Sequence, residues 1–113
     1  MRKIVTAMLV AFAVAILFAA SGLMAQKGDA AAGKAVYASK CAMCHGADGA
    51  GKEAMAKMLK VEFKHLGSKE VQDKSDADLK KEIDAGTGKM KPVKLAKDAD
   101  MANLIAHMRT LKK

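Results

Sequence analysis

Five consecutive residues constrain the fold of this chain more than any other feature: Cys41, Ala42, Met43, Cys44 and His45. Two cysteines separated by two residues and followed directly by a histidine form the C-x-x-C-H pattern of covalent haem attachment. One short helical turn with this spacing can present both thiols to the two haem vinyl groups, and the adjacent imidazole can then bind the iron from one face. The pattern therefore predicts a domain folded around one covalently bound haem c.

Two other uses of a C-x-x-C pair stay open at this point, a thiol redox pair and a zinc site. A thioredoxin-like pair normally follows a strand, and no strand pattern precedes Cys41. The chain has only two cysteines, so a zinc site would need His65 and His107, whose spacing fits no zinc finger. The position of His45 directly after Cys44 favours haem over both alternatives.

Residues 1–25 have the pattern of a secretory signal peptide. Arg2 and Lys3 form a basic start, residues 4–20 are uncharged and mainly apolar, and small residues in 21–25 offer a cleavage site. The pattern predicts export, and for a bacterial protein this means the periplasm.

Cleavage after Ala25 would leave residues 26–113 as the mature protein, a single domain. Residues 19–21 offer a second cleavage site. The alternative is an uncleaved membrane anchor, because the apolar run is borderline in length for a bilayer span.

The composition is basic, with 20 Lys and Arg against 12 Asp and Glu. Such a balance favours acidic partners or surfaces. The chain has no Trp, one Tyr and three Phe, so it lacks the interleaved aromatic residues that would favour nucleic-acid binding. A domain this small buries little surface of its own, and a cofactor is expected to complete its core.

The first predicted helix spans residues 27–40, with Asp29 as its N-cap. Gly33 lies inside this helix, where glycine costs about 1 kcal/mol relative to alanine. We therefore expect another helix to cross closely at Gly33, beside Tyr37.

The second clear helix spans residues 75–85, with Ser75 as N-cap and Gly86 as C-terminal stop. Its apolar residues Leu79 and Ile83 are four apart and are predicted to face inward.

The last predicted helix spans residues 98–111 and is expected to be capped by Asp98. Its apolar stripe has helical spacing and contains Met101, Leu104, Ile105, Met108 and Leu111. His107 lies off this stripe and is predicted to face solvent. No segment alternates with a period of two, so no sheet is expected.

A glycine- and proline-containing loop is predicted at residues 86–93, with Met90 in its middle. Met90 could be a core residue that fills a gap, but a thioether in a loop that can approach a flat cofactor favours it as the second iron ligand. His65 is a weaker candidate. The other mature methionines are less suitable because they lie between the cysteines, too soon after His45, or on the last helix: Met43, Met55, Met58, Met101 and Met108.

The chain closely resembles the small class I c-type cytochromes of bacteria over nearly all of residues 29–113. The resemblance is carried by Gly33 and Tyr37, by the C-x-x-C-H motif with Gly46, by residues 86–92 and by residues 104–111. It implies an all-α fold, a cytochrome c-like bundle of three to five helices around one covalently attached haem.

The resemblance also implies roles for individual residues. Cys41 and Cys44 would be the thioether sites, His45 the proximal iron ligand and Met90 the distal one. The chain departs from the family pattern at Lys91, which separates the methionine from a proline that often follows it directly.

The function implied is one-electron transfer in the periplasm, without catalysis, between redox partner proteins with acidic docking surfaces. Alternatives are the haem subunit of a larger oxidoreductase and a haem-based sensor or enzyme for small ligands. Four lysines on and after the predicted ligand loop are either a solvated charge run or a positive ring that attracts the partner: Lys89, Lys91, Lys94 and Lys97.

Overall fold

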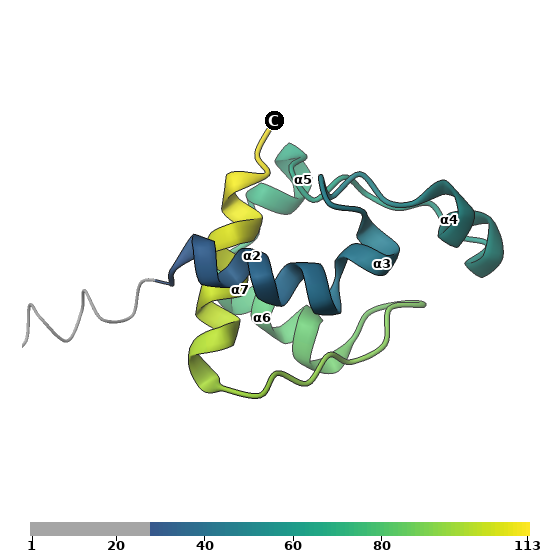
Figure 1. The fold of residues 1–113 in the computed structure, drawn as a ribbon. Helices are drawn as coiled ribbons and strands as arrows, with labels where there is room; N and C mark the ends of the chain where they lie inside the picture. The colour runs from purple at the N-terminus through teal and green to yellow at the C-terminus, as the bar shows by residue number, and fades with distance from the viewer. Residues whose placement is uncertain (1–27) are drawn as a thin grey trace, which may run out of the picture.

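The computed structural model describes residues 28–113, so the predicted signal peptide lies outside the described residues. The described chain forms six helices: α2 (Ala30–Lys40), α3 (Ala42–His45), α4 (Glu53–Leu59), α5 (Lys69–Gln72), α6 (Asp76–Ala85) and α7 (Asp98–Thr110), as shown in Figure 1. Residues 28–113 contain no strand, only an isolated bridge between Thr87 and Met90. The all-α fold class is confirmed.

Six helices are present where three to five were expected, because α3 and α5 are single turns of four residues each. Neither turn is long enough to show a helical hydrophobic period in the sequence. None of the helices in the described part of the chain is long and apolar enough to cross a membrane.

The α2–α7 crossing is the most extensive helix contact in the described chain. A Cβ atom on Gly33 would lie 1.7 Å from the backbone oxygen of Asn103 in α7, so only glycine permits this approach. The Asn103 side chain accepts a hydrogen bond of 2.8 Å from the backbone N–H of Asp29, at the start of α2. The predicted close crossing at Gly33 is confirmed.

The core lies between α2, α5, α6 and α7. Leu104 of α7 is fully buried at its centre. The other buried apolar residues are Tyr37, Val71, Leu79, Ile83, Met101, Ile105 and Met108. Cys41 and Met90 are partly buried and pack against this cluster, so the core supports two of the predicted haem residues.

The predicted N-caps are correct for α2 and α6. The Asp29 carboxylate accepts from the backbone N–H groups of Ala31 and Ala32, and the Ser75 hydroxyl accepts from that of Asp78. The cap predicted for α7 is wrong, because Asp98 is already its first helical residue.

The cap position of α7 is occupied by Lys97, whose backbone N–H donates to the Asp100 carboxylate at 3.2 Å. An acidic residue inside the first turn reaches back to the chain in this way, and it also interacts favourably with the helix dipole.

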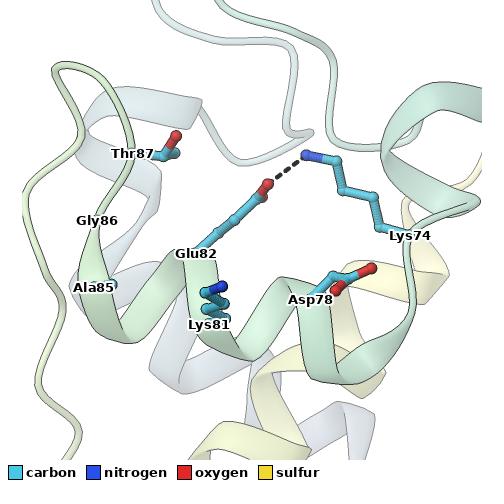
Figure 2. Close-up of a pocket in the computed structure, with 7 residues that line it drawn as sticks. All are labelled: Lys74, Asp78, Lys81, Glu82, Ala85, Gly86 and Thr87. Carbon is cyan, nitrogen blue, oxygen red and sulfur yellow. Dashed lines mark hydrogen bonds and ion pairs between the residues drawn. The ribbon is translucent and has the colours of Figure 1, made fainter.

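A hollow of about 320 Å³ lies beside α6 and the turn that follows it (Figure 2). Lys74 and Glu82 extend into it and form an ion pair of 2.6 Å. Both side chains are about one-third exposed, so the pair contributes little to stability. The lining is strongly charged, which is unlike the apolar walls expected around a haem.

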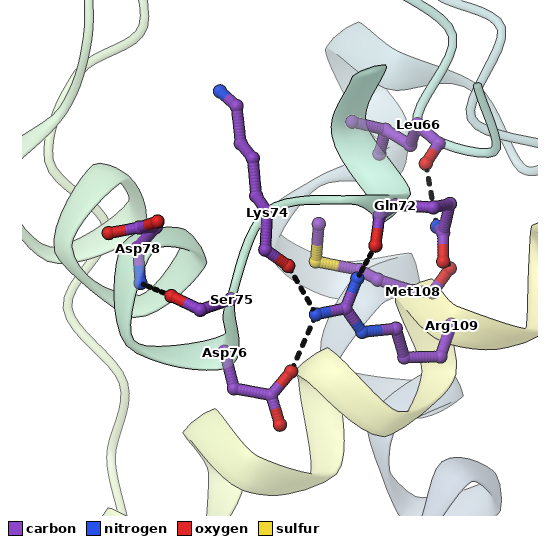
Figure 3. A network of polar contacts seen from close by, with 8 residues as sticks. All are labelled: Leu66, Gln72, Lys74, Ser75, Asp76, Asp78, Met108 and Arg109. Carbon is purple, nitrogen blue, oxygen red and sulfur yellow. Dashed lines mark hydrogen bonds and ion pairs between the residues drawn. The ribbon is translucent and has the colours of Figure 1, made fainter. Parts of the chain in front are cut away.

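Arg109 of α7 joins the last helix to the junction between α5 and α6 (Figure 3). Its guanidinium donates to the backbone oxygens of Gln72 and Lys74, each at 2.8 Å, and to the Asp76 carboxylate at 2.7 Å. The Gln72 side chain in turn donates to the backbone oxygen of Met108 at 3.0 Å. These bonds satisfy the end of the one-turn helix α5 and hold it against α7.

His107 is the second incorrect prediction, because it is buried with 8% of its surface exposed. Its ring packs on that of Tyr37, with centroids 5.1 Å apart and an interplanar angle of 57°. The apolar stripe of α7 faces the core, but α2 crosses on the adjacent side of the helix and buries His107 as well.

We expect His107 to make the fold sensitive to acid. Burial, and secondarily the charge of Lys34, lowers the pKa of His107 below its ordinary value. The unfolded chain therefore binds this proton more readily, so stability is complete above the unfolded-state pKa of about 6.5 and falls as the pH drops from there toward the lower folded-state pKa.

The measurement is the urea midpoint of the haem-containing protein at about pH 7 and about pH 5, since the window lies below the ordinary histidine pKa. His107→Phe keeps a ring against Tyr37 and removes the titration, so its midpoint should fall less. Equal losses in the two proteins would contradict the assignment to His107.

Candidate haem-binding site

The C-x-x-C-H motif forms a tight corner between α2 and α3. Cys41 is both the C-cap of α2 and the N-cap of α3, with φ −120° and ψ −37°. Its backbone oxygen accepts from the N–H groups of Cys44 at 3.2 Å and His45 at 2.9 Å. The motif is therefore one closed helical turn that starts at the first cysteine and ends at the histidine, as the spacing predicts.

The carbonyl groups at the end of this turn are also held. The Cys44 oxygen accepts from the N–H of Lys52 at 2.8 Å, and the His45 oxygen accepts from that of Gly51 at 2.7 Å. For these bonds to form, the chain after His45 must reverse direction and return to the end of the turn. Gly51 permits this reversal because its φ is 89°, a value that residues with a side chain rarely adopt. The glycine-containing loop that follows His45 thus fixes the backbone of the histidine.

The His45 imidazole is well suited to bind a metal. Its Nδ1 atom is buried and has no hydrogen-bond partner among residues 28–113. The ring and that of Phe63 pack in a T-shaped arrangement, with centroids 5.3 Å apart. Burial lowers the pKa of His45, which favours the neutral imidazole that ligates iron. A buried polar atom without a partner is costly, and these features fit a haem ligand.

The two cysteines do not have the properties of a thiol redox pair. Cys41 and Cys44 are both partly buried and form no disulfide with each other. Burial, together with the neighbouring Cys44, raises the pKa of Cys41 to about 11, whereas a reactive redox cysteine needs a lowered pKa. The zinc alternative has no support either, because the described residues contain no group of three or more His, Cys, Asp or Glu that could hold a metal.

Met90 lies in a tight turn after α6. The N–H groups of Thr87 and Met90 donate to each other's backbone oxygens at 3.0 and 2.9 Å. A Cβ on Gly86 would lie 2.5 Å from the Met90 oxygen, so this glycine allows the turn to close. The N–H of Val93 donates to the Ile83 oxygen at 2.9 Å and returns the chain to α6.

The other ligand candidates are placed differently. The Nδ1 atom of His65 accepts from the N–H of Gly67 at 2.9 Å and so caps a local turn. Met43 and Met58 are 73% and 66% exposed, while Met101 and Met108 belong to the core. None of the four predicted haem residues lines the charged hollow beside α6.

Sequence reasoning missed two contacts of the site. Phe63 packs on His45 although the two residues are 18 positions apart along the chain. The Tyr37 hydroxyl donates to the Gly46 oxygen at 2.6 Å, and Tyr37 was predicted only as a packing residue. A short-range pattern carries no signal for either contact.

Comparisons with known proteins agree with this geometry. Residues 30–112 match the sequence model of the family described as Cytochrome c. The chain is similar to cytochrome c-554(547) of Halothiobacillus neapolitanus, with 38% identity over 93 residues, which cover 75% of this chain and 99% of the relative. It is also similar to the solved structure of the KustC0563 c-type cytochrome, with a TM-score of 0.59, 27% identity and coverage of 72% of this chain and 98% of the other.

Proposed function

Since this chain belongs to the cytochrome c family and is a small c-type cytochrome with covalently bound haem c, we propose that it is a periplasmic one-electron carrier. The observation that carries the proposal is the His45 imidazole, buried and without a partner at Nδ1, on a turn that starts at Cys41. When bound, the haem supplies an iron that changes between the ferrous and ferric states.

In this proposal Cys41 and Cys44 would hold the haem through two thioether bonds, and His45 and Met90 would be the protein ligands of its iron. Because the protein would hold both ligands in place, the bound haem would supply one-electron chemistry with little rearrangement of the chain. The soft sulfur of Met90 favours the ferrous state and raises the potential. The hydrogen-bonded turns that carry His45 and Met90 support this assignment, because each ligand has a defined backbone.

Residues 1–25 are proposed as a signal peptide cleaved after Ala25, and residues 26–113 as the haem domain. The basic start and apolar run support export. Purified protein from the native host should begin at Gln26, as N-terminal sequencing or intact mass would show. A protein that starts at Met1 in the membrane fraction would instead support an uncleaved anchor.

The partner is proposed to be a redox protein with an acidic docking surface. Lys89 and Lys91 are exposed on the Met90 loop, and Lys94 and Lys97 are exposed just after it. Positive charges near the proposed iron ligand would attract an oppositely charged redox protein and so increase the rate at which the two proteins associate.

Stopped-flow electron exchange with an acidic redox protein tests the function and the docking surface together. The protein should accept and return one electron reversibly, at a rate that falls steeply with ionic strength because screening weakens the attraction. Charge reversal at Lys89 and Lys91 should slow exchange more than reversal at Lys112 and Lys113, which are also exposed lysines. If both pairs of reversals slow exchange equally, the effect comes from net charge and not from a docking surface at the Met90 loop. If the protein shows no reversible exchange, it is not an electron carrier.

A further inference from the structure

Tyr37 connects the helix crossing to the predicted iron ligand. It is only 2% exposed, and its hydroxyl donates a bond of 2.6 Å to the backbone oxygen of Gly46, directly after His45. The other backbone donor to this oxygen in the described chain is the N–H of Gly49, at a longer 3.3 Å. The tyrosine therefore provides the stronger restraint at the point where the chain leaves the motif.

The tyrosine is itself held firmly. Its ring packs on His107 of α7, and its backbone is part of α2, where Gly33 brings the two helices into contact. Burial, together with nearby Cys41 and Asp48, raises the pKa of Tyr37 to about 12, so the hydroxyl keeps its proton and remains a donor. The restraint on Gly46 thus originates in the most extensive helix contact of the described chain.

We propose that Tyr37 is a positioning residue for the iron ligand: its hydroxyl fixes the Gly46 carbonyl and so the direction in which the His45 imidazole points. Packing at the crossing requires an aromatic ring but no hydroxyl, so the two roles of this residue are separable. The inference rests on the proposed function, because it assumes that His45 binds the iron.

Tyr37→Phe in the haem-containing protein keeps the ring and removes the bond. Backbone N–H groups of His45 and Gly46 should exchange with solvent about tenfold faster, the factor expected for one buried hydrogen bond. The hyperfine-shifted NMR signals of the His45 ring in the ferric protein should move, and the reduction potential should change with them.

Leu104→Val is the matched control, because it shortens a fully buried side chain of the same core and removes no hydrogen bond to Gly46. It should lower the thermal midpoint and leave the His45 signals and the potential unchanged. Unchanged exchange, signals and potential in Tyr37→Phe would overturn the proposal, as would equal changes in Leu104→Val.

A second variant does not depend on how well Tyr37→Phe folds. Tyr37 is the single tyrosine of the chain, so incorporation of fluorotyrosine alters this hydroxyl alone. The more acidic phenol is a stronger donor, and exchange at His45 and Gly46 should slow; no change would contradict the proposal. If unmutated protein shows no hyperfine-shifted His45 signals, the ligand assignment itself fails, which is a different result from failure of the Tyr37 role.

Discussion

Replacement of Cys41 and Cys44 together by alanine is expected to abolish covalent retention of haem. The two thiols flank a single turn closed by the bonds from His45 and Cys44 to the Cys41 oxygen, and no other cysteine exists in the chain. The measurement is extraction with acidified acetone, which removes haem that is held only by ligation. Unmutated protein should keep its haem, and the double variant should lose all of it.

The double variant is preferable to either single one, because a remaining thiol in an oxidising compartment can pair with another molecule. Met43→Leu is the matched control: its side chain lies between the cysteines and is 73% exposed, so haem retention should be unaffected. The double variant should also fold less stably, because a domain of this size depends on its cofactor to complete the core. Loss of haem from unmutated protein on extraction would overturn the role of the cysteines.

The main helices could be predicted from sequence because their signals are local. Asp29 and Ser75 cap helices through side-chain bonds to N–H groups two or three residues ahead. The glycine at position 33 was informative for a different reason: an unfavourable residue in a helix interior usually has a packing cause, here the Asn103 backbone.

Most of the errors concern features that depend on distant segments. The burial of His107 is decided by α2, which lies far away in sequence, and not by the periodicity of α7. The one-turn helix α5 is too short for a periodic signal, and Arg109 stabilises it from 37 residues away through the Gln72 carbonyl. The error at the N-cap of α7 is local: Asp98 has the residue type of an N-cap, but the Lys97 N–H donates to Asp100, and the cap is Lys97, one residue earlier than predicted.

In the candidate site too, local features could be predicted from the sequence, whereas contacts between distant segments could not. The cysteines and the histidine are adjacent in sequence, so their common turn could be predicted. Met90 is 45 residues beyond His45, and only the loop composition and the family resemblance pointed to it. The partners that hold the site, Tyr37 and Phe63, come from other segments and required the structure.

Replacement of Met90 by alanine is expected to change both the absorption spectrum and the reduction potential of the haem strongly. The ferric unmutated protein should show the weak far-red absorption of sulfur-to-iron charge transfer, and this variant should lose it entirely. Its reduction potential should fall, because the thioether that favours the ferrous state is gone. Cyanide or imidazole should then bind at the open position, which spectroscopic titration would measure.

Met90→His separates loss of sulfur from loss of a ligand. It should keep the iron six-coordinate and still lower the potential, since imidazole stabilises ferric iron more than a thioether does. Four of the other methionines serve as controls, each changed to leucine: Met55, Met58, Met101 and Met108. Such volume-conserving changes should leave the band in place and cost less than about 1.5 kcal/mol each.

The pattern of bands decides between two kinds of haem protein. If the band persists in Met90→Ala and disappears in one of the leucine variants, another methionine is the ligand and the turn between Thr87 and Met90 has only a structural role. If unmutated protein lacks the band and its ferrous form binds carbon monoxide readily, the iron has an open position. That result would count against the electron carrier and favour a sensor or enzyme for small ligands, because a carrier needs both protein ligands in place in both oxidation states.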